Sequence, residues 1–460
     1  ITPDATLGEP AVVFTYTAAG QRASMTDGSG VTGYAYDSRG WPSEKATARG
    51  TLAYTHDAGG NLTRIRSSNS GGTDVSYSWD AAGQLVSTTD NRLTSGLTVA
   101  NYTPTGMPST VTQPTGVRAS YSRDALERVT ALSWNPGAGG GGGGGAGGGA
   151  PPLASYAYAL APTGHRLSVT EASGRRASYA YDAGKRLSGE TITADPAPAG
   201  NGAVGYTLDA VGNRLTCTST LAAVPAASYS HDPNDRLTSD IYDANGNTRT
   251  RDGVNYTYDH ADRLVSKNAG EVTVLYDGDG ARVGKTVGGV TTRYLVDDLN
   301  PTGYSQVLEE VTGGAVTRVL TYGSMPLGQS RATGGGAGAW ATSYFGYDAH
   351  GNVTFLTDET GAVTDRYTYD AFGNLIARTG TTPNEYLYNG QRFDADLGLY
   401  HLRARYYEPG RGRFVTRDPF EGFTGIPLSL HKYLYAHSDP VNLSDPSGMF
   451  AATGYGRMTG

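Results

Sequence analysis

Three aspartates in the C-terminal part of the sequence each stand directly before a proline: Asp418, Asp439 and Asp445. Arg417 precedes the first of them. Two carboxyl groups held close together cannot both ionise, so one keeps a proton while the other can activate a water molecule. The Asp-Pro dipeptide also marks turns, and the residues alone favour three turns over a catalytic site.

The rest of the sequence offers no stronger site for chemistry. The eight histidines form no His-Glu-x-x-His or similar ligand pattern, and the single cysteine, Cys217, predicts a small strand residue rather than a metal ligand. Residues 277–280 (Asp-Gly-Asp-Gly) resemble the start of a calcium loop but lack the glutamate expected at its twelfth position. We therefore expect neither a metal ion nor a cofactor.

The elements that must position these residues are dominated by an internal repeat. The pattern Tyr-x-Tyr-Asp-x-x-Gly-x-Leu recurs with variations, at several places after about 20 residues. The copies are residues 34–40, 54–62, 77–85, 179–187, 206–215, 229–237, 256–264, 276–283, 345–353 and 367–375, with degenerate copies at 121–129 and 158–167.

Each copy has the chemistry of a β-hairpin. Two tyrosines separated by one residue point to the same face of a strand. The aspartate starts a turn because its carboxylate accepts a backbone N–H two residues on, and the glycine, or the asparagine after it, supplies the positive φ of a tight turn. A lone hairpin is marginal in water, so each must pair with its neighbours. The repeat predicts an all-β chain, one continuous antiparallel ribbon of hairpins, in which repeat tyrosines and aspartates are structural.

The composition agrees with this interpretation. Among 460 residues there are 66 glycines and 32 tyrosines, which disfavour helices and favour strands. No apolar run is long enough for a membrane helix, and a net charge of −7 gives no general reason to expect nucleic-acid binding. The segment Ile1–Phe14 lacks the regions of a signal peptide, so we expect the sequence to be a piece of a longer polypeptide. The glycine-rich tract at residues 137–152 predicts a loop inserted between hairpins.

The repeat resembles the YD repeat of the Rhs family, which includes bacterial polymorphic toxins, the C components of Tc toxin complexes and the teneurin ectodomains. The resemblance extends from about residue 34 to residue 449. Its most specific part is C-terminal, where five motifs together resemble the Rhs repeat-associated core domain. These are residues 367–374 (YTYDAFGN), 388–396 (YNGQRFDAD), 398–407 (GLYHLRARYY), 412–419 (GRFVTRDP) and 433–449 (YLYAHSDPVNLSDPSGM).

The resemblance implies a domain plan. In the family, spiralling antiparallel hairpins form a hollow shell or barrel that is closed by the core domain and holds a C-terminal polypeptide. We therefore expect a YD-repeat shell at residues 1–365, a core domain at 366–449, and the start of a variable region at 450–460. This last stretch, which follows Met449, is too short to form a folded toxin domain.

The resemblance also implies self-cleavage after the core domain. Many members cut their chain after a final Asp-Pro-x-Gly-Leu motif, which corresponds here to residues 445–449 and places the scissile bond between Met449 and Phe450. The family's chemistry is aspartyl-protease-like, and Asp418 and Asp445 match its motif. Arg417 matches a position that can hold a carboxylate or polarise a carbonyl.

Two further expectations concern the neighbours of these residues. Asp439 is the reserve candidate for the catalytic pair. Residues 420–432 are longer than usual in the family, which could displace Asp418 from the cleavage site. The nearby arginines are expected to pair with carboxylates and line the core domain rather than bind nucleic acid; they are Arg403, Arg405, Arg411, Arg413 and Arg417.

Two functions of different classes remain open. The first is a secreted shell that encapsulates its own C-terminal toxin or effector and releases it by aspartyl self-cleavage after Met449. The alternative is a non-catalytic extracellular structural or adhesive protein, such as a surface scaffold or a filament; carbohydrate binding by surface tyrosines is a weaker third idea. Expected partners are the chain's own C-terminal cargo and a second shell component or another copy, with no nucleic acid and no transmembrane segment. The expected location is secreted or at the cell surface.

Overall fold

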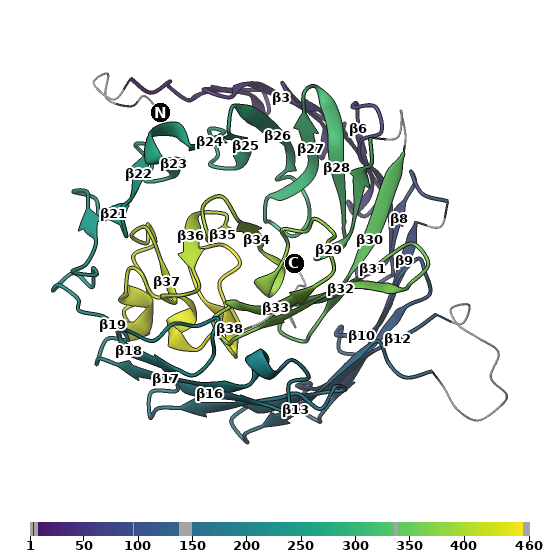
Figure 1. Ribbon diagram of the computed structural model, residues 1–460. Coiled ribbons are helices and arrows are strands. Elements are labelled where there is room, and N and C mark those ends of the chain that lie inside the picture. The colour runs from purple at the N-terminus through teal and green to yellow at the C-terminus, as the bar shows by residue number, and fades with distance from the viewer. Residues whose placement is uncertain (1–2, 4–7, 95, 138–149, 335–338, 454–460) are drawn as a thin grey trace. The chain divides into compact units, whose positions relative to one another are not determined.

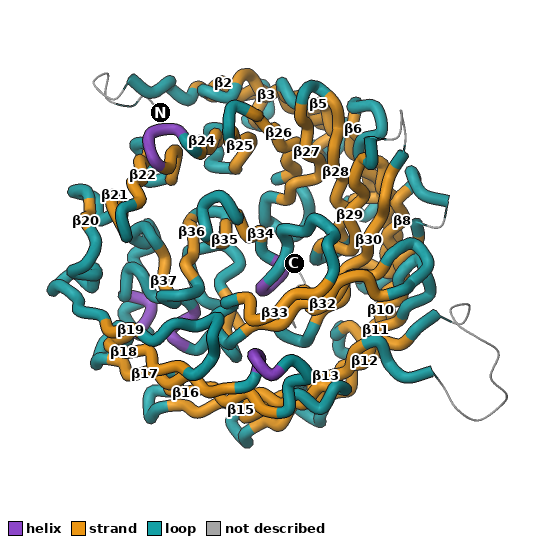
Figure 2. Tube along the Cα trace, in the orientation of Figure 1, coloured by secondary structure: helices purple, strands orange, loops and turns teal. Residues whose placement is uncertain are grey.

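The computed structural model describes residues 3, 8–94, 96–137, 150–334 and 339–453. These residues form an all-β fold with a few short 3₁₀ turns, as Figures 1 and 2 show. Their strands make two long sheets of 19 and 14 strands and two short sheets of four and two strands. Within each long sheet, strands adjacent in sequence pair antiparallel, so the predicted antiparallel hairpins are confirmed. The described strands do not form the single continuous ribbon that was predicted, because they divide into two sheets between β19 (Ala227–Ser228) and β20 (Ile241–Tyr242). Most of the glycine-rich tract at 137–152 and of the expected variable region at 450–460 lies outside the described residues.

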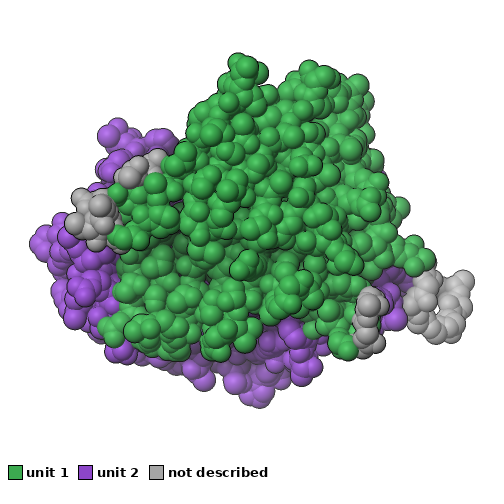
Figure 3. Space-filling view, turned by 90° about the horizontal axis from the view of Figure 1, so that it is seen from above, with its two compact units in different colours: residues 1–100, 255–344, 458–460 green, residues 101–254, 345–457 purple. Residues whose placement is uncertain are grey.

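The chain divides into two compact units, each built from two long stretches of sequence (Figure 3). The first unit contains residues 1–100, 255–344 and 458–460. Its strands, some of which extend past these limits by a few residues, are β1 (Val13–Tyr16), β2 (Arg22–Asp27), β3 (Gly30–Tyr36), β4 (Pro42–Thr47), β5 (Gly50–His56), β6 (Leu62–Ser67), β7 (Asp74–Trp79), β8 (Leu85–Asp90), β9 (Leu97–Tyr102), β22 (Val254–Tyr258), β23 (Leu264–Lys267), β24 (Val272–Tyr276), β25 (Arg282–Val287), β26 (Val290–Asp297), β27 (Gln306–Thr312), β28 (Ala315–Tyr322), β29 (Pro326–Ala332) and β30 (Trp340–Tyr347), with the 3₁₀ turn η3 (Asn268–Gly270).

The second unit contains residues 101–254 and 345–457 and carries all the candidate site residues. Its first stretch holds β10 (Pro108–Thr112), β11 (Arg118–Arg123), β12 (Val129–Asn135), β13 (Ala154–Leu160), β14 (Arg166–Glu171), β15 (Arg176–Tyr181), β16 (Leu187–Thr193), η2 (Pro198–Gly200), β17 (Gly202–Leu208), β18 (Arg214–Ser219), β19 (Ala227–Ser228), β20 (Ile241–Tyr242) and β21 (Thr248–Arg251). Its second stretch holds β31 (Val353–Thr357), β32 (Val363–Tyr369), β33 (Leu375–Thr379), η4 (Tyr388–Gly390), β34 (Arg392–Asp394), β35 (Leu399–Leu402), β36 (Arg405–Glu408), β37 (Arg413–Phe414), η5 (Pro427–Leu430), η6 (Ala436–Ser438), β38 (Leu443–Ser444) and β39 (Ala452–Thr453). The predicted domain boundary between residues 365 and 366 falls within β32 and stays a prediction.

The hairpin turns follow the predicted chemistry of the repeat. In the turn between β5 and β6, Asp57 Oδ1 accepts the backbone N–H groups of Gly59 (2.8 Å) and Asn61 (3.0 Å), and Gly60 has a φ of +91°. The asparagine does not supply the positive φ as an alternative to glycine; its side-chain Nδ2 instead donates to Asp57 Oδ2 (2.9 Å). The same aspartate turn also occurs at Asp243 and Asp358, two copies that the sequence pattern did not identify.

Aromatic side chains of the repeat lie on the buried face of their strands and join neighbouring hairpins. In β17, Tyr206 is buried while the next residue, Thr207, is exposed, as the alternating pattern predicts. The second aromatic of the pattern often donates a hydrogen bond to a backbone carbonyl at the start of the preceding strand. Examples are Tyr181 to Arg166 (2.6 Å), Tyr369 to Val353 (2.8 Å) and the indole of Trp79 to Leu62 (2.7 Å). Each bond ties one hairpin to the next, so rigidity does not require disulfides.

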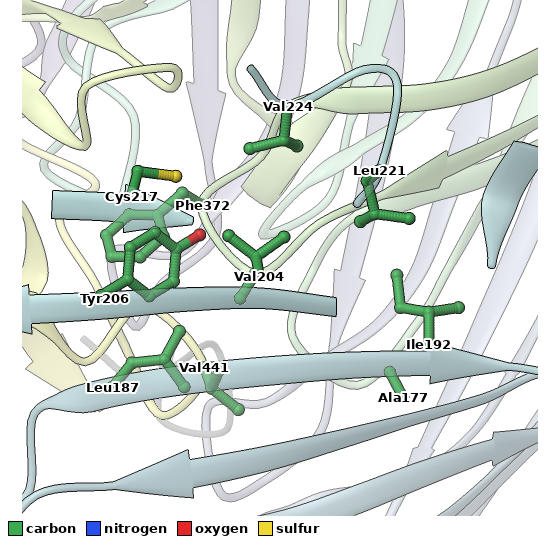
Figure 4. Close-up of a cluster of buried hydrophobic side chains, with 11 residues drawn as sticks. Ala177, Leu187, Ile192, Val204, Tyr206, Cys217, Leu221, Val224, Phe372 and Val441 are labelled. Atoms are coloured by element: carbon green, nitrogen blue, oxygen red, sulfur yellow. The ribbon is translucent and has the colours of Figure 1, made fainter. Parts of the chain in front are cut away.

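One apolar cluster in the second unit joins its two stretches of chain (Figure 4). Side chains from β15 to β18 pack against Phe372, at the tip of the β32–β33 hairpin, and Val441. The rings of Tyr206 and Phe372 meet edge to face with centroids 5.1 Å apart. Cys217 is buried in this cluster, as predicted for a small strand residue. The cluster fixes the C-terminal stretch, which carries the candidate site, against the repeat strands.

Candidate functional site

The candidate site is built on the four-stranded sheet β34–β37. A tight turn between β35 and β36 pairs Leu402 with Arg405, so that Arg405 begins β36. The chain then passes through β37 to Asp418, and returns through η6 and β38 to Asp445. The three side chains come from segments that are far apart in the sequence, and the sheet brings them together.

Arg405 joins the two predicted catalytic aspartates. Its Nη2 lies 2.6 Å from Asp418 Oδ2 and 3.5 Å from Asp445 Oδ2. All three side chains are buried, with exposed fractions of 2%, 8% and 3%. The guanidinium also stacks on the ring of Phe414, 3.6 Å from its centroid. The structure therefore brings the predicted carboxylate pair together around one buried cation.

The predicted scissile segment folds around Asp445. Asp445 Oδ1 accepts the backbone N–H groups of Met449 (3.0 Å) and Phe450 (3.2 Å), and it accepts the hydroxyl of Ser447 (3.0 Å). The Arg405 Nε–H donates to the carbonyl oxygen of Gly448. A carboxylate thus lies within hydrogen-bond distance of the nitrogen that would leave if the Met449–Phe450 bond were cut.

Backbone constraints hold this segment in place. Gly448 has a φ of +72°, and a Cβ at this position would lie 2.2 Å from the carbonyl oxygen of Leu402, so only glycine fits. On either side of the segment, β38 and β39 pair through Leu443 with Thr453 and Ser444 with Ala452. The predicted scissile bond therefore lies in the loop of a short hairpin that is pressed against the turn before Arg405.

Burial controls the protonation of the pair. It raises the pKa of Asp418 to about 6, although the Arg405 guanidinium acts in the opposite direction. Burial also raises the pKa of Asp445 and lowers the pKa of Arg405. Because two nearby carboxyl groups share one cation, one of them can keep a proton near neutral pH while the other is ionised.

The other two predicted site residues lie among different neighbours. Arg417 is 51% exposed, and the carboxylate paired with it is that of Glu421, at 4.0 Å. Asp439 accepts a hydrogen bond from Asn442 Nδ2 (2.7 Å) and lies 3.7 Å from His165 Nε2. Neither side chain contacts the Arg405 cluster through an interaction in the part of the chain that the structure describes. Their catalytic roles stay predictions.

Arg405 is the residue whose part in the site the sequence did not single out. It was one of five arginines expected to pair with nearby carboxylates, and that expectation is confirmed for it. The expected displacement of Asp418 by the long segment at 420–432 does not occur. The Asp418 N–H donates to the carbonyl of Lys432 (2.8 Å), which also accepts from Arg405 Nη1 (3.2 Å), so the segment closes into a loop with both ends at the site.

No three histidine, cysteine, aspartate or glutamate side chains gather as ligands for a metal ion among residues 3, 8–94, 96–137, 150–334 and 339–453. Over the same residues, no helix has both the length and the apolar character needed to span a membrane.

Comparison with known proteins identifies similar chains. The teneurin YD-shell family model matches residues 164–441, and the RHS repeat model matches residues 56–95. The tRNA nuclease WapA of Bacillus subtilis (strain 168) is 35% identical over 258 residues, which are 53% of this chain and 11% of WapA. The double-stranded DNA deaminase toxin A of Burkholderia cenocepacia (strain H111) is 28% identical over 242 residues, 45% of this chain and 16% of the toxin.

The same fold occurs in solved structures. The crystal structure of TcdB2-TccC3 aligns with 96% of this chain and 26% of its own chain, with a TM-score of 0.74 and 18% sequence identity. A second crystal structure, TcdB2-TccC3-TEV, gives a TM-score of 0.75 at 17% identity and covers 96% of this chain and 25% of that chain. This chain therefore spans only about a tenth to a quarter of the length of these relatives and solved structures.

Proposed function

Because the chain belongs to the RHS/YD-repeat proteins with a teneurin YD-shell, we propose that it forms the shell of a secreted toxin-type protein and cuts its own backbone between Met449 and Phe450. The observation that carries the proposal is the contact of Asp445 with the N–H groups on both sides of the Met449 carbonyl. The shell would enclose the polypeptide that follows the cut.

The container role is supported by the relatives. WapA is named a tRNA nuclease and the Burkholderia protein a DNA deaminase toxin, yet this chain matches only 11% and 16% of them. A hairpin segment shared by proteins with different enzymatic activities fits a common container better than a common enzyme. The similarity to TcdB2-TccC3 suggests that a second shell component, or a second copy, completes the enclosure.

In the proposed reaction, ionised Asp418 removes a proton from a water molecule, which adds to the carbonyl carbon of Met449. Water addition makes the nitrogen of Phe450 pyramidal, so it can turn its lone pair toward Asp445, whose Oδ1 accepts its N–H at 3.2 Å before the reaction. Protonated Asp445 then supplies the proton to that lone pair, and the bond breaks to release the nitrogen as an amine. The raised pKa values of both carboxyl groups favour having one protonated and one ionised form together.

Arg405 is a positioning residue in this proposal. Its Nη2 contacts both carboxylates, and its Nε–H donates to the carbonyl of Gly448, next to the reacting peptide. It therefore fixes the aspartates and the substrate segment relative to each other, which is the condition for an intramolecular reaction to be fast.

Intact mass spectrometry of the purified chain tests the proposal, since cleavage removes residues 450–460 and leaves a new N-terminus at Phe450. We expect Asp418→Asn and Asp445→Asn to slow cleavage at least about 100-fold, the usual contribution of a general acid or base. Asp439→Asn is the matched control because its partners are Asn442 and His165, and it should cleave like the unchanged protein. A chain that stays uncut, or is cut equally in all variants, would refute the aspartyl mechanism.

The ion pairs of Arg405 also favour a second candidate function, a purely structural end of an extracellular YD-repeat protein. A buried guanidinium that contacts two aspartates can also serve a purely structural role, because removing one partner of a buried ion pair is destabilising. In that case Asp418→Asn and Asp445→Asn would lower stability without any effect on the mass of the chain. Mass and unfolding measurements on the same variants separate the two functions.

A further inference from the structure

A small cavity of about 20 Å³ lies inside the second unit, away from the Arg405 cluster. It is lined by the turn before β18, by residues on both sides of the start of β37, and by the segment that follows η5. A space of this size holds a single water molecule or one monatomic ion and excludes larger ligands. Its walls bring together the repeat strands and the C-terminal stretch of the chain.

Arg214 is the main charged group at this cavity. Its side chain lies between two aromatic rings, with its guanidinium carbon 4.4 Å from the centroid of Tyr206 and 4.2 Å from that of Phe372. Nη1 donates to the carbonyl of Gly410 (3.1 Å), but buried Nη2 has no hydrogen-bond partner among the described residues. The residue is only 8% exposed, so water outside the protein does not compensate its charge.

Arg413 adds a second buried cation. It is also 8% exposed, its Nη2 donates to the carbonyl of Asp235 (2.7 Å), and its guanidinium lies over the ring of Tyr433. No carboxylate of the described ranges lies within ion-pair distance of Arg214 or Arg413. Asp370 nevertheless acts electrostatically on Arg214 over a longer distance, as Asp240 and Glu408 do on Arg413. Arg411, on the same wall, differs because Asp240, Asp252 and Glu408 lie close to it.

The two histidines at the cavity are neutral and do not add positive charge to it. His431 Nδ1 accepts the backbone N–H groups of Tyr433 and Leu434 (both 3.1 Å), so its Nε2–H donates to Asn213 Oδ1 (2.9 Å) and the ring is neutral. Burial lowers the pKa of His231, and its buried Nδ1 has no partner among the described residues. Asp235 is the carboxylate closest to His431, at 3.9 Å, and its Oδ1 already accepts from Asn213 Nδ2 (2.7 Å).

We propose that this cavity binds one monatomic anion, chloride under physiological conditions, through Arg214 Nη2 and with Arg413 supplying further positive charge. Nη2 of Arg214 is a buried, positively charged donor without a hydrogen-bond partner among the described residues, and the cavity has room for one ion that could accept from it. A bound anion would link the β17–β18 hairpin to β37 and thereby hold the C-terminal stretch in place. This binding does not depend on cleavage after Met449.

A crystal of the intact chain grown in bromide tests the site directly. We expect an anomalous scattering peak within contact distance of Arg214 Nη2. An ordered water there, with no bromide signal, would overturn the proposal.

Thermal unfolding in chloride and in gluconate at equal ionic strength gives an independent test, because gluconate is too large for the cavity. We expect a higher unfolding midpoint in chloride, by several degrees, for the unchanged chain and for the control Arg64→Gln, whose side chain is 45% exposed. In Arg214→Gln the chloride-specific rise should disappear. A rise that persists in Arg214→Gln contradicts the site, and if that variant does not fold, the bromide experiment on the unchanged chain decides.

Discussion

The same aspartate turn occurs in the repeat hairpins and at the candidate site, with opposite electrostatic results. Asp57, in a repeat turn, accepts N–H groups two and four residues ahead, and Asp445 accepts the N–H of Met449, four residues ahead, in the same way. The hydrogen bond from Asn61 holds the pKa of solvent-facing Asp57 below its usual value, whereas burial raises the pKa of Asp445. The difference teaches that the motif sets the geometry of the turn, while burial decides whether its carboxylate can carry a proton.

Removing the buried cation should have the largest effect. Arg405→Gln leaves Asp418 and Asp445 without their shared partner in a buried place. Loss of one partner from a buried ion pair typically costs about 3–5 kcal/mol, so we expect a loss of this size in the free energy of unfolding. Arg64→Gln breaks the ion pair between Arg64, whose side chain is 45% exposed, and Asp74. This change should lower the free energy of unfolding by only about 0.2–1 kcal/mol.

Urea unfolding of the two variants measures both values. If Arg405→Gln costs no more than Arg64→Gln, the buried cluster is no different from a surface ion pair and the contrast between the two regions fails.

A methyl group at Gly448 should have the next largest effect. Gly448→Ala forces a Cβ to within 2.2 Å of the Leu402 carbonyl and keeps a positive φ, so the segment must move away from Asp445. Gly174, in the turn that joins β14 to β15, also has a positive φ but has open space around its Cβ position. We expect Gly174→Ala to cost about 1 kcal/mol in unfolding free energy without affecting cleavage, and Gly448→Ala to cost more and to slow cleavage. Equal cleavage rates in both variants would show that the position of this segment does not matter.

The pH dependence of stability should have opposite signs in the two regions. The pKa of Asp418 is raised to about 6 in the folded chain, so the folded state binds a proton more tightly than the unfolded state. Its contribution to stability is complete below pH 3.8 and is lost as the pH rises to about 6. For Asp57 the folded pKa is lowered, so its contribution is present above pH 3.8 and is lost as the pH falls.

Unfolding midpoints measured from pH 3 to pH 7 test these signs. The unfolding midpoint of the unchanged chain minus that of Asp418→Asn should fall as the pH rises. The corresponding value for Asp57→Asn should rise. If these two midpoint differences change with pH in the same direction, the buried and the solvent-facing aspartate do not behave differently and the prediction is wrong.

The smallest effect is expected for Arg417→Gln. Arg417 is 51% exposed and its carboxylate partner is Glu421 at 4.0 Å, so the change in unfolding free energy should stay within about 0.5 kcal/mol. Cleavage measured by mass should continue at the rate of the unchanged chain. Slower cleavage in this variant would support the role that the sequence motif predicts for Arg417.

Much of the fold could be predicted because its rules are local. An aspartate, a glycine three residues on and two alternating tyrosines are enough to predict a hairpin, since the bonds that close the turn join residues at most four apart. The turns at Asp243 and Asp358 were not identified because the tyrosine pattern before them is incomplete, although their aspartates bond in the same way.

The sequence alone determined the antiparallel hairpins and the shared strand face of the paired tyrosines, and its resemblance to the Rhs family identified the two aspartates that meet at the predicted cleavage point. Only the tertiary structure decided that Arg405, and not Arg417, holds both carboxylates, and that the long segment at 420–432 leaves Asp418 in place. The physical reason is distance along the chain. Spacing encodes hydrogen bonds within a turn, whereas burial, and the pairing of charges that lie far apart in the sequence, depend on how strands pack.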